Sequence, residues 1–357
     1  MPREFRVRSH SVGPDAPMFV IAEIGLNHNG KVDLALRLVD AAARAGVSAV
    51  KLQLFEADRL VAAESPSLAH VADASLREVF RRFELDAAAC ATLVARARSL
   101  GLAVIVTPFD LGAVQQCVDL GVDALKIASG DLTHVGLIEA AAATGLPVVL
   151  STGLSTEPDV TRALDWARRA GAHDVALLHC VSAYPTPDDQ QNLRAVATLA
   201  STFDVPVGLS DHGMGRDAAL LACALGAVLY ERHLHLPGTD AIDAAVSSSP
   251  DELADIVRAV ARGRAALGEG QRRPMPAELP NLEASRRGLY ATRSLAAGHV
   301  VTADDVVALR PVRTLDASRL HTLIGSRLGR RVEAGSPFDP RDLASPSAAT
   351  TDEGPTP

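Results

Sequence analysis

The chain has 357 residues, of which 48% are hydrophobic and 22% charged, and its formal net charge is −8 at pH 7. This length and composition suit two folded domains and exclude a chain that is disordered throughout. The acidic balance argues against nucleic acid or an anionic membrane as the main partner, because both are negatively charged themselves.

The start of the chain, MPREFRVRSHSVGPDAP, is polar and lacks the apolar stretch of a secretory signal. No run reaches the roughly 18 apolar residues that a membrane span needs. The four cysteines, Cys90, Cys117, Cys180 and Cys223, are scattered without a CxxC pair, which is typical of reduced thiols. We therefore expect a cytoplasmic protein without a membrane span.

Short apolar runs recur along the first two-thirds of the chain and predict eight strands. They are apolar on both faces, as strands of a helix-covered parallel sheet are. Helical patterns such as DLALRLVDAAARAG lie between them. Eight such units predict a TIM (β/α)8 barrel. A doubly wound sheet is the alternative, but it calls for a glycine-rich first turn, whereas this turn is EIGLNHNG. The predicted strands are 19–25, 47–53, 102–108, 123–129, 146–152, 174–180, 205–211 and 227–233.

The residue composition of the sequence changes after the segment with the barrel pattern. We expect the barrel over 1–267, a proline-rich linker over 268–285, a small β-rich domain over 286–345 and a disordered tail over 346–357. The small domain contains a weak repeat, in which AAGHVVTADDV and EAGSPFDPRDL share the pattern AG-x6-D-[VL]. Two similar halves predict a pseudo-twofold arrangement within it.

Polar side chains stand at the C-terminal ends of the predicted strands, where barrel enzymes place their chemistry. Lys51 and Lys126 lie inside otherwise apolar strands, and a buried lysine needs a partner. One interpretation is a salt bridge to a neighbouring carboxylate. The other is an anionic ligand, and hydroxyl groups on further strand ends favour it. The strand-end set is Glu23, Lys51, Gln53, Thr107, Lys126, Ser129, Ser151, Thr152, Ser182, Tyr184, Ser210, His212, Glu231 and His233.

His212 in VGLSDH and His233 in VLYERH end two neighbouring strands, so their imidazoles can converge. A single strand-end histidine is usually structural, but two beside an anion site favour a metal ion. Two protein ligands leave an open coordination sphere. This suits Mn²⁺, with Mg²⁺ or Co²⁺ as alternatives, acting as a Lewis acid.

With these motifs the sequence resembles the sialic acid synthase family. The matching stretches are IAEIGLNHNG, KLQLF, TPFD, KIASGD, LSTG, HCVSAYPTP, VGLSDH and ERH, which cover every predicted strand. The C-terminal piece, with LAAGHVVTADDV and an RP pair at 310–311, is similar to that family's antifreeze-like SAF domain.

The resemblance implies a transferase that condenses phosphoenolpyruvate with N-acetylmannosamine or a related hexosamine. Its products would be a nine-carbon 2-keto-3-deoxy sugar acid and phosphate. The implied catalytic residues are Glu23, Lys126 and Asp131, the last standing where the family usually has Glu. The implied phosphoenolpyruvate-binding residues are Lys51, Thr107, Lys126, Ser129, Ser151, Ser182 and Ser210, with Ser182 where Asn is usual. The implied sugar-binding residues are Gln53, Tyr184, Asp240 and Arg310, and the implied metal ligands are His212 and His233.

The resemblance also implies a domain-swapped homodimer, in which each SAF domain covers the partner's barrel and brings Arg310 to the acceptor. One alternative is the same chemistry on another aldose, such as a precursor of legionaminic acid, pseudaminic acid or a secondary-metabolite sugar. A second is an aldolase or lyase that forms a Schiff base on Lys126. A third is a scaffold that only binds a sugar acid, although Glu23, both lysines and both histidines argue against it.

Overall fold

The computed structural model describes residues 4–65 and 75–344. The predicted tail 346–357 lies outside the described residues. The chain divides into two compact units, with the boundary between Glu269 and Gly270, close to the predicted end of the barrel domain.

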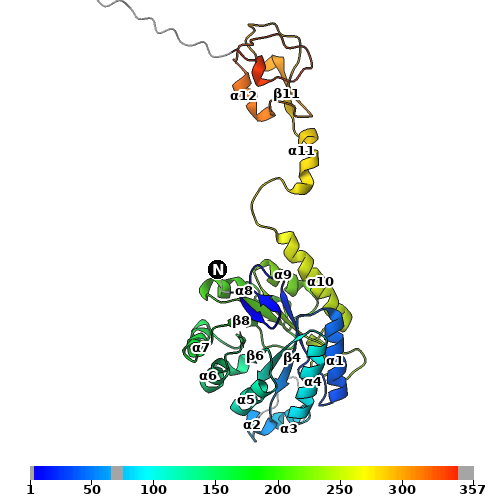
Figure 1. The fold of residues 1–357 in the computed structure, drawn as a ribbon, viewed down its shortest axis with the longest axis vertical. Coiled ribbons are helices and arrows are strands. Elements are labelled where there is room, and N and C mark those ends of the chain that lie inside the picture. The colour runs from blue at the N-terminus through cyan, green and yellow to red at the C-terminus, as the bar shows by residue number, and fades with distance from the viewer. Residues whose placement is uncertain (1–3, 66–74, 345–357) are drawn as a thin grey trace, which may run out of the picture. The chain divides into compact units, whose positions relative to one another are not determined.

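Eight parallel strands close into a barrel in the first unit, in the ring order β10-β3-β4-β5-β6-β7-β8-β9. The first and last of these strands pair and close the ring, with Phe19 beside Leu229 and Glu23 beside His233. Helices surround the strands (Figure 1), which confirms the predicted TIM barrel. The strands are β3 Phe19–Glu23, β4 Ala49–Leu54, β5 Ala103–Pro108, β6 Ala124–Ile127, β7 Val148–Ser151, β8 Val175–Cys180, β9 Val207–Asp211 and β10 Leu229–His233.

Local signals set where the helices begin and end. The first turn of α10 contains Pro250 and is capped reciprocally by Ser249 and Glu252. Helix α1 ends at Gly46, whose φ of 80° is the left-handed conformation that glycine adopts without strain.

None of the described helices is long and apolar enough to cross a membrane. The helices of this unit are α1 Val32–Ala45, α2 Ala57–Leu60, α3 Leu76–Arg81, α4 Ala87–Ser99, α5 Leu111–Asp119, α6 Val135–Ala143, α7 Glu157–Arg169, α8 Ala195–Thr202, α9 Asp217–Ala224 and α10 Pro250–Leu267.

Side chains alternate along each barrel strand between an inner and an outer core. On β6, Ala124 belongs to the inner cluster, while Leu125 and Ile127 pack outward against the helices. The period of two then points Lys126 inward, above Ala124. The same step on β3, from Phe19 and Ile21 to Glu23, brings a carboxylate to the top of the barrel. The inner apolar layers thus carry the polar strand ends.

A short N-terminal hairpin was not predicted. It consists of β1 Phe5–Val7 and β2 His10–Val12, paired antiparallel. Its apolar residues join the inner barrel cluster at the level where the strands begin, so the hairpin closes the end of the barrel opposite the predicted site. Strands of three residues are too short for an apolar period to reveal.

The second unit contains β11 Gly288–Ala291 and β12 Val306–Leu309, paired antiparallel, and a short helix α12 Leu320–Leu323. The sequence repeat is also a structural repeat. Arg293 pairs with Asp305 in the first half, and Arg330 pairs with Asp342 in the second. Each aspartate caps a single helical turn from its third position.

The predicted linker 268–285 is not wholly irregular. It contains the turn Pro276–Glu278 and helix α11 Leu279–Ser285. Of the three prolines that suggested a linker, Pro276 and Pro280 stand in the first turns of these elements, where a missing N–H costs no helical hydrogen bond, and Pro274 precedes both elements.

Candidate active site

A cavity of about 250 Å³ opens at the C-terminal ends of the barrel strands. All eight strands contribute to its wall, which is why a set of residues scattered through the sequence converges there. Aromatic and aliphatic side chains from loops form part of the rim. The lining residues are Glu23, Leu26, Lys51, Gln53, Phe80, Thr107, Phe109, Lys126, Ala128, Ser129, Gly130, Ser151, Cys180, Ser182, Tyr184, Ser210, His212, Glu231, His233 and Asp243.

Both predicted lysines lie in this cavity, and each contacts a carboxylate. The Lys51 ammonium contacts Glu23 from the neighbouring strand and donates to Thr107 Oγ1 at 3.3 Å. Lys126 Nζ lies 3.2 Å from Glu231 Oε1. The structure therefore contains the salt bridges that the sequence left open as one interpretation, and the lysines alone do not establish an anionic ligand.

Burial and charge perturb these groups in opposite directions. Burial lowers the pKa of Lys51 to about 8, although the Glu231 carboxylate opposes this. Burial alone would raise the pKa of Glu231, but the ammonium groups of Lys126 and Lys51 hold it well below its usual range. The cavity is thus a compact array of alternating charges with little solvent between them.

Unsatisfied polar atoms concentrate in the cavity. Within the described residues, eight buried side-chain nitrogen or oxygen atoms lack a hydrogen-bond partner of acceptable geometry, and five of them line this cavity. Folded proteins seldom leave such atoms unsatisfied, because each costs desolvation free energy without a compensating bond. Their concentration marks the cavity as a place for a polar ligand. The five are Glu23 Oε1 and Oε2, Ser151 Oγ, Glu231 Oε2 and His233 Nδ1. Of these, Glu23 Oε2 contacts the Lys51 ammonium and His233 Nδ1 lies 3.4 Å from Asp243 Oδ2, so three have neither a hydrogen bond nor an ion pair among the described residues.

Small hydroxyl side chains form one side of the cavity. The Gly153 N–H donates to Ser129 Oγ at 3.1 Å. A Cβ atom at Gly153 would come within 2.7 Å of Ser129 Oγ and 2.5 Å of Ser182 Oγ. These three residues come from loops after three different strands, so the absence of a side chain at Gly153 is what lets the two hydroxyls approach. Ser210 donates to Glu231 Oε1 at 2.9 Å.

The two histidines meet at the other side of the cavity, with ring centroids 5.3 Å apart. His212 Nδ1 lies 2.9 Å from the Val181 carbonyl oxygen, and His233 Nδ1 lies 3.4 Å from Asp243 Oδ2. Each ring therefore has its Nδ1 directed at a protein oxygen and its Nε2 left for another partner, as in histidines that bind metals. Tyr184 stacks on His212 at 4.1 Å between ring centroids.

The pair fits a divalent cation with an open coordination sphere. Burial lowers the pKa of His233, which favours the neutral, metal-binding imidazole. Among the described residues no group of three or more His, Cys, Asp or Glu side chains is arranged to hold a metal ion. A cation held by the two histidines alone would take its other ligands from solvent or substrate.

Three residues expected at the site do not line the cavity. Asp131 is half-buried in the turn Ser129–Asp131, and burial raises its pKa. Asp240 is exposed, and only its backbone carbonyl is engaged, by Asn29 Nδ2 at 2.6 Å. Arg310 belongs to the second unit, where it is exposed after β12.

Asp243 lines the cavity, whereas Asp240, three residues earlier in the same loop, is exposed and does not. Gly238, with a φ of 79°, turns the chain before Asp240 reaches the barrel mouth. The buried Asn27 then accepts from the Asp243 N–H at 3.1 Å and donates to the Leu234 carbonyl, which folds the loop inward. The sequence signal for this was the NHNG turn, whose buried asparagine needs backbone partners.

Glu231 is a second functional candidate that the site prediction omitted. It was recognised as a strand end, but no role was given to it. Its side chain lies between Lys126 and Ser210 at the centre of the cavity. The inward alternation of β10, shared with His233, is the signal that could have found it.

Comparison with protein families gives a match to the NeuB family over residues 38–272. The chain belongs to the NeuB family. A separate match to the SAF domain covers residues 286–344, which corresponds to the second unit. The resemblance found in the motifs is thus confirmed over most of the chain, and the protein is an enzyme of the sialic acid synthase type.

The NeuB relatives include enzymes for several sugar acids. The N,N'-diacetyllegionaminic acid synthase of Legionella pneumophila is 34% identical over 91% of this chain and 94% of its own length. The pseudaminic acid synthase of Helicobacter pylori is 30% identical over 92% and 98%. The crystal structure of an N-acetylneuraminic acid synthetase from Leptospira borgpetersenii, in complex with citrate, matches with a TM-score of 0.72 and 34% identity, covering 79% of this chain and 96% of that chain.

Proposed function

We propose that the barrel condenses phosphoenolpyruvate with the open-chain aldehyde of an N-acylated amino sugar, forming a 2-keto-3-deoxy sugar acid and phosphate. The observation that carries this proposal is the cluster of buried polar atoms without a hydrogen-bond partner beside two buried lysines in one cavity. Family membership supports it, because the related enzymes are named as synthases of such acids.

The lysines and hydroxyls suit the phosphoenolpyruvate. Lys51 and Lys126 would hold its carboxylate and phosphate by charge-assisted hydrogen bonds, with the hydroxyls of Ser151 and Ser210 beside them. In the unliganded protein, the carboxylates of Glu23 and Glu231 form ion pairs with Lys51 and Lys126. The anionic substrate would therefore join existing ion pairs. The further residues proposed for this donor site are Thr107, Ser129 and Ser182.

The condensation requires a new C–C bond and the loss of phosphate. C3 of phosphoenolpyruvate attacks the acceptor aldehyde carbon, water adds to C2, and the resulting tetrahedral centre expels phosphate by C–O cleavage. Glu23 contacts Lys51 through Oε2 while its Oε1 has no hydrogen-bond partner, and the carboxylate would take the proton from that water as general base. Lys126 would stabilise the negative charge of the departing phosphate. No catalytic role is assigned to Asp131, which lies outside the cavity lining.

His212 and His233 would hold a divalent cation, Mn²⁺ in our proposal, through their Nε2 atoms. Bound there, the cation would supply Lewis-acid polarisation of the acceptor carbonyl. Tyr184 and Asp243 flank the two imidazoles and would, with Gln53, face the sugar.

The acceptor is proposed to be N-acetylmannosamine or a related hexosamine, which would give a nine-carbon product. The named relatives make different acids, so the same chemistry on a precursor of legionaminic or pseudaminic acid, or on another aldose, is the second candidate. The loop that carries Asp243 is where such specificity would be set, because it borders the acceptor side of the cavity.

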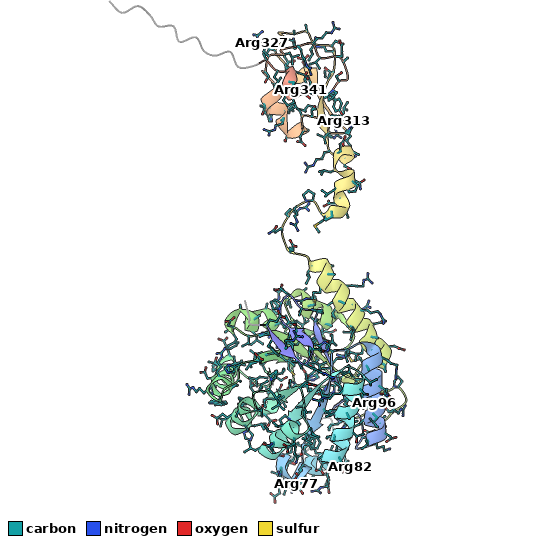
Figure 2. The ribbon with its side chains drawn as sticks, in the orientation of Figure 1. Arg77, Arg82, Arg96, Arg313, Arg327 and Arg341 are labelled. Atoms are coloured by element: carbon teal, nitrogen blue, oxygen red, sulfur yellow. The ribbon has the colours of Figure 1, made fainter. Side chains whose placement is uncertain are left out.

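We further propose a domain-swapped homodimer in the cytoplasm, in which the second unit covers the partner's barrel and supplies Arg310. The charges of the units favour this contact: residues 1–269 have 23 basic and 33 acidic side chains, whereas residues 270–357 have 12 and 10. The basic side chains of the second unit include Arg313, Arg327 and Arg341 (Figure 2). Opposite net charge promotes such docking.

The test is phosphate release from phosphoenolpyruvate with a panel of acceptors: N-acetylmannosamine, its 6-phosphate, diacetamido-trideoxyhexoses and plain aldoses. We expect release only with an N-acylated amino sugar. Phosphate release in the absence of any acceptor would contradict the proposal. A lack of release with every acceptor of the panel would contradict it as well. Borohydride treatment in the presence of substrate separates the aldolase alternative, since only a Schiff base on Lys126 would add mass to the protein.

A further inference from the structure

A buried ion pair lies directly behind the two histidines, on the outer face of the barrel strands. Asp211 is the last residue of β9 and directly precedes His212, and Arg232 precedes His233 on β10. Asp211 and Arg232 are register partners on these adjacent strands. Because side chains alternate, the histidines point into the cavity while Asp211 and Arg232 point toward the helices. Their side chains are only 3% and 4% exposed, and Arg232 Nη1 lies 3.1 Å from Asp211 Oδ2.

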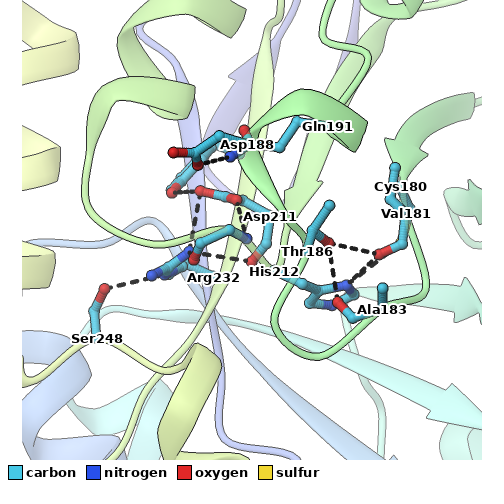
Figure 3. A network of polar contacts seen from close by, with 12 residues as sticks. Cys180, Val181, Ala183, Thr186, Asp188, Gln191, Asp211, His212, Arg232 and Ser248 are labelled. Carbon is cyan, nitrogen blue, oxygen red and sulfur yellow. Dashed lines mark hydrogen bonds and ion pairs between the residues drawn. The ribbon is translucent and has the colours of Figure 1, made fainter.

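The Arg232 guanidinium donates hydrogen bonds to the chain segments that lie beside each of the two histidines (Figure 3). Its Nη1 donates to the Gly213 carbonyl at 2.6 Å, immediately after His212. Its Nε donates to Ser248 Oγ at 3.1 Å. The Ser248 N–H in turn donates to the His233 carbonyl at 2.8 Å. One side chain thus connects the backbone next to His212 with the residue that holds the backbone of His233.

Asp211 completes the connection. Its Oδ1 accepts from the Gly213 N–H at 2.8 Å, and its Oδ2 accepts from the Tyr230 hydroxyl at 2.7 Å. Both carboxylate oxygens of Asp211 and the Nε and Nη1 atoms of Arg232 are therefore engaged within the chain, and neither side chain lines the cavity. Breaking a buried ion pair that is bonded in this way leaves an unsatisfied charge.

We propose that Arg232 and Asp211 are positioning residues that fix the separation and orientation of the His212 and His233 imidazoles, and so set the affinity of the site for a divalent cation. This inference rests on the proposed metal site. Outer partners that orient metal-binding histidines typically change metal affinity or activity about 10- to 100-fold when they are removed. Here the outer partners would act through backbone that they hold on both strands.

The experiment measures Mn²⁺ binding to the full-length, metal-free protein by calorimetry. Arg232→Met keeps the apolar stem and removes all donors, Arg232→Lys keeps the charge without the forked geometry, and Asp211→Asn keeps the volume. We expect the Kd for Mn²⁺ to rise at least about 10-fold in Arg232→Met, with a smaller rise in Arg232→Lys. Because the donor pocket is intact, KM for phosphoenolpyruvate should change little while kcat falls.

The matched control is Arg293→Met, which breaks another ion pair to a fully buried aspartate, in the second unit. It should lower thermal stability and leave the Mn²⁺ affinity unchanged. If Arg232→Lys and Asp211→Asn lose stability but bind Mn²⁺ within twofold of the unmodified protein, the pair is only structural and the inference is wrong. An unmodified protein that releases phosphate yet binds no Mn²⁺ would overturn the metal site and this inference together, while leaving the condensation itself standing.

Discussion

Replacing Lys126 by Met separates the structural contribution of its ion pair from its role in binding substrate. Lys126 and Glu231 are each 5% exposed, with 3.2 Å between Nζ and Oε1. At an effective dielectric constant of about 20, that separation corresponds to an attraction of about 5 kcal/mol. Removing one partner of a buried pair usually costs about 3–5 kcal/mol, because the other charge remains buried.

We therefore expect Lys126→Met to lower the free energy of unfolding of the barrel by about 3–5 kcal/mol. The double variant Lys126→Met/Glu231→Gln removes the uncompensated carboxylate and should recover most of that loss. Neither variant should release phosphate, because both lack the Lys126 ammonium that is proposed to bind phosphoenolpyruvate. Loss of activity without loss of stability in the double variant is the signature of an ion pair that serves the reaction and is not needed for folding.

Urea unfolding followed by fluorescence measures the stability term. The chain has one tryptophan, Trp166 on α7, which packs against the outer barrel core, so its emission reports on the barrel unit. Arg258→Met is the matched control: it breaks a surface pair to Asp255 on α10 that is more than half exposed, and it should change stability by less than about 1 kcal/mol.

Two results would refute the reasoning. If Lys126→Met is as stable as the unmodified protein, the Glu231 carboxylate does not depend on the lysine charge, and the ion pair contributes nothing to folding. If the double variant turns over phosphoenolpyruvate at the normal rate, Lys126 is not part of the donor site.

Four further outcomes are expected. Chelator-treated protein should lose activity and regain it with Mn²⁺, and His212→Ala should abolish Mn²⁺ binding without unfolding; full turnover by metal-free protein would contradict this. Gly153→Ala should reduce phosphoenolpyruvate affinity with little change in Tm, because its Cβ would displace two hydroxyls at the cavity wall; unchanged KM would show that this wall does not touch the donor. The Asp305 carboxylate is buried, which alone would raise its pKa, but bonds from His299, Thr302 and Arg293 hold the pKa well below its usual range. The stability that this carboxylate contributes should therefore be present above about pH 4 and disappear as the pH falls further. The test is the Tm difference between Asp305→Asn and the unmodified protein, which should shrink in acid; a difference independent of pH would show that the carboxylate is not the stabilising group. Mixing Lys126→Ala with Arg310→Ala should restore part of the activity after subunit exchange; no recovery in confirmed mixed dimers would mean that the site is built within one subunit or does not use Arg310.

The sequence was sufficient to predict the barrel and most of the cavity wall, for one physical reason. In a parallel barrel, the last inward residue of each strand must face the mouth, so a polar residue that ends an apolar run is a site residue by geometry. Thr107, Ser151 and Ser210 follow this rule, and on β4 the residue in that position is Gln53, with Lys51 one inward step deeper in the strand.

Loop residues and pairings did not follow from the sequence. Asp240 and Asp243 are three positions apart in one loop, and the bond from the Asp243 N–H to the buried Asn27 side chain joins residues that are distant in the sequence. The pairing of each lysine with a particular glutamate depends on the stagger of neighbouring strands, which periodicity does not reveal. Contacts between β9 and β10 behind the histidines were hidden for the same reason.

The closure of the barrel has a consequence for how the chain is made. Strand β3 pairs on one side with β4, but its other edge finds its partner only in β10, where Phe19 meets Leu229. During synthesis β3 leaves the ribosome long before β10 exists, so this edge stays open while the intervening strands are added. An open strand edge can pair with the wrong chain. The barrel therefore cannot be finished strand by strand as it emerges, and slow translation between β3 and β10 would prolong the period in which the nascent chain depends on chaperones.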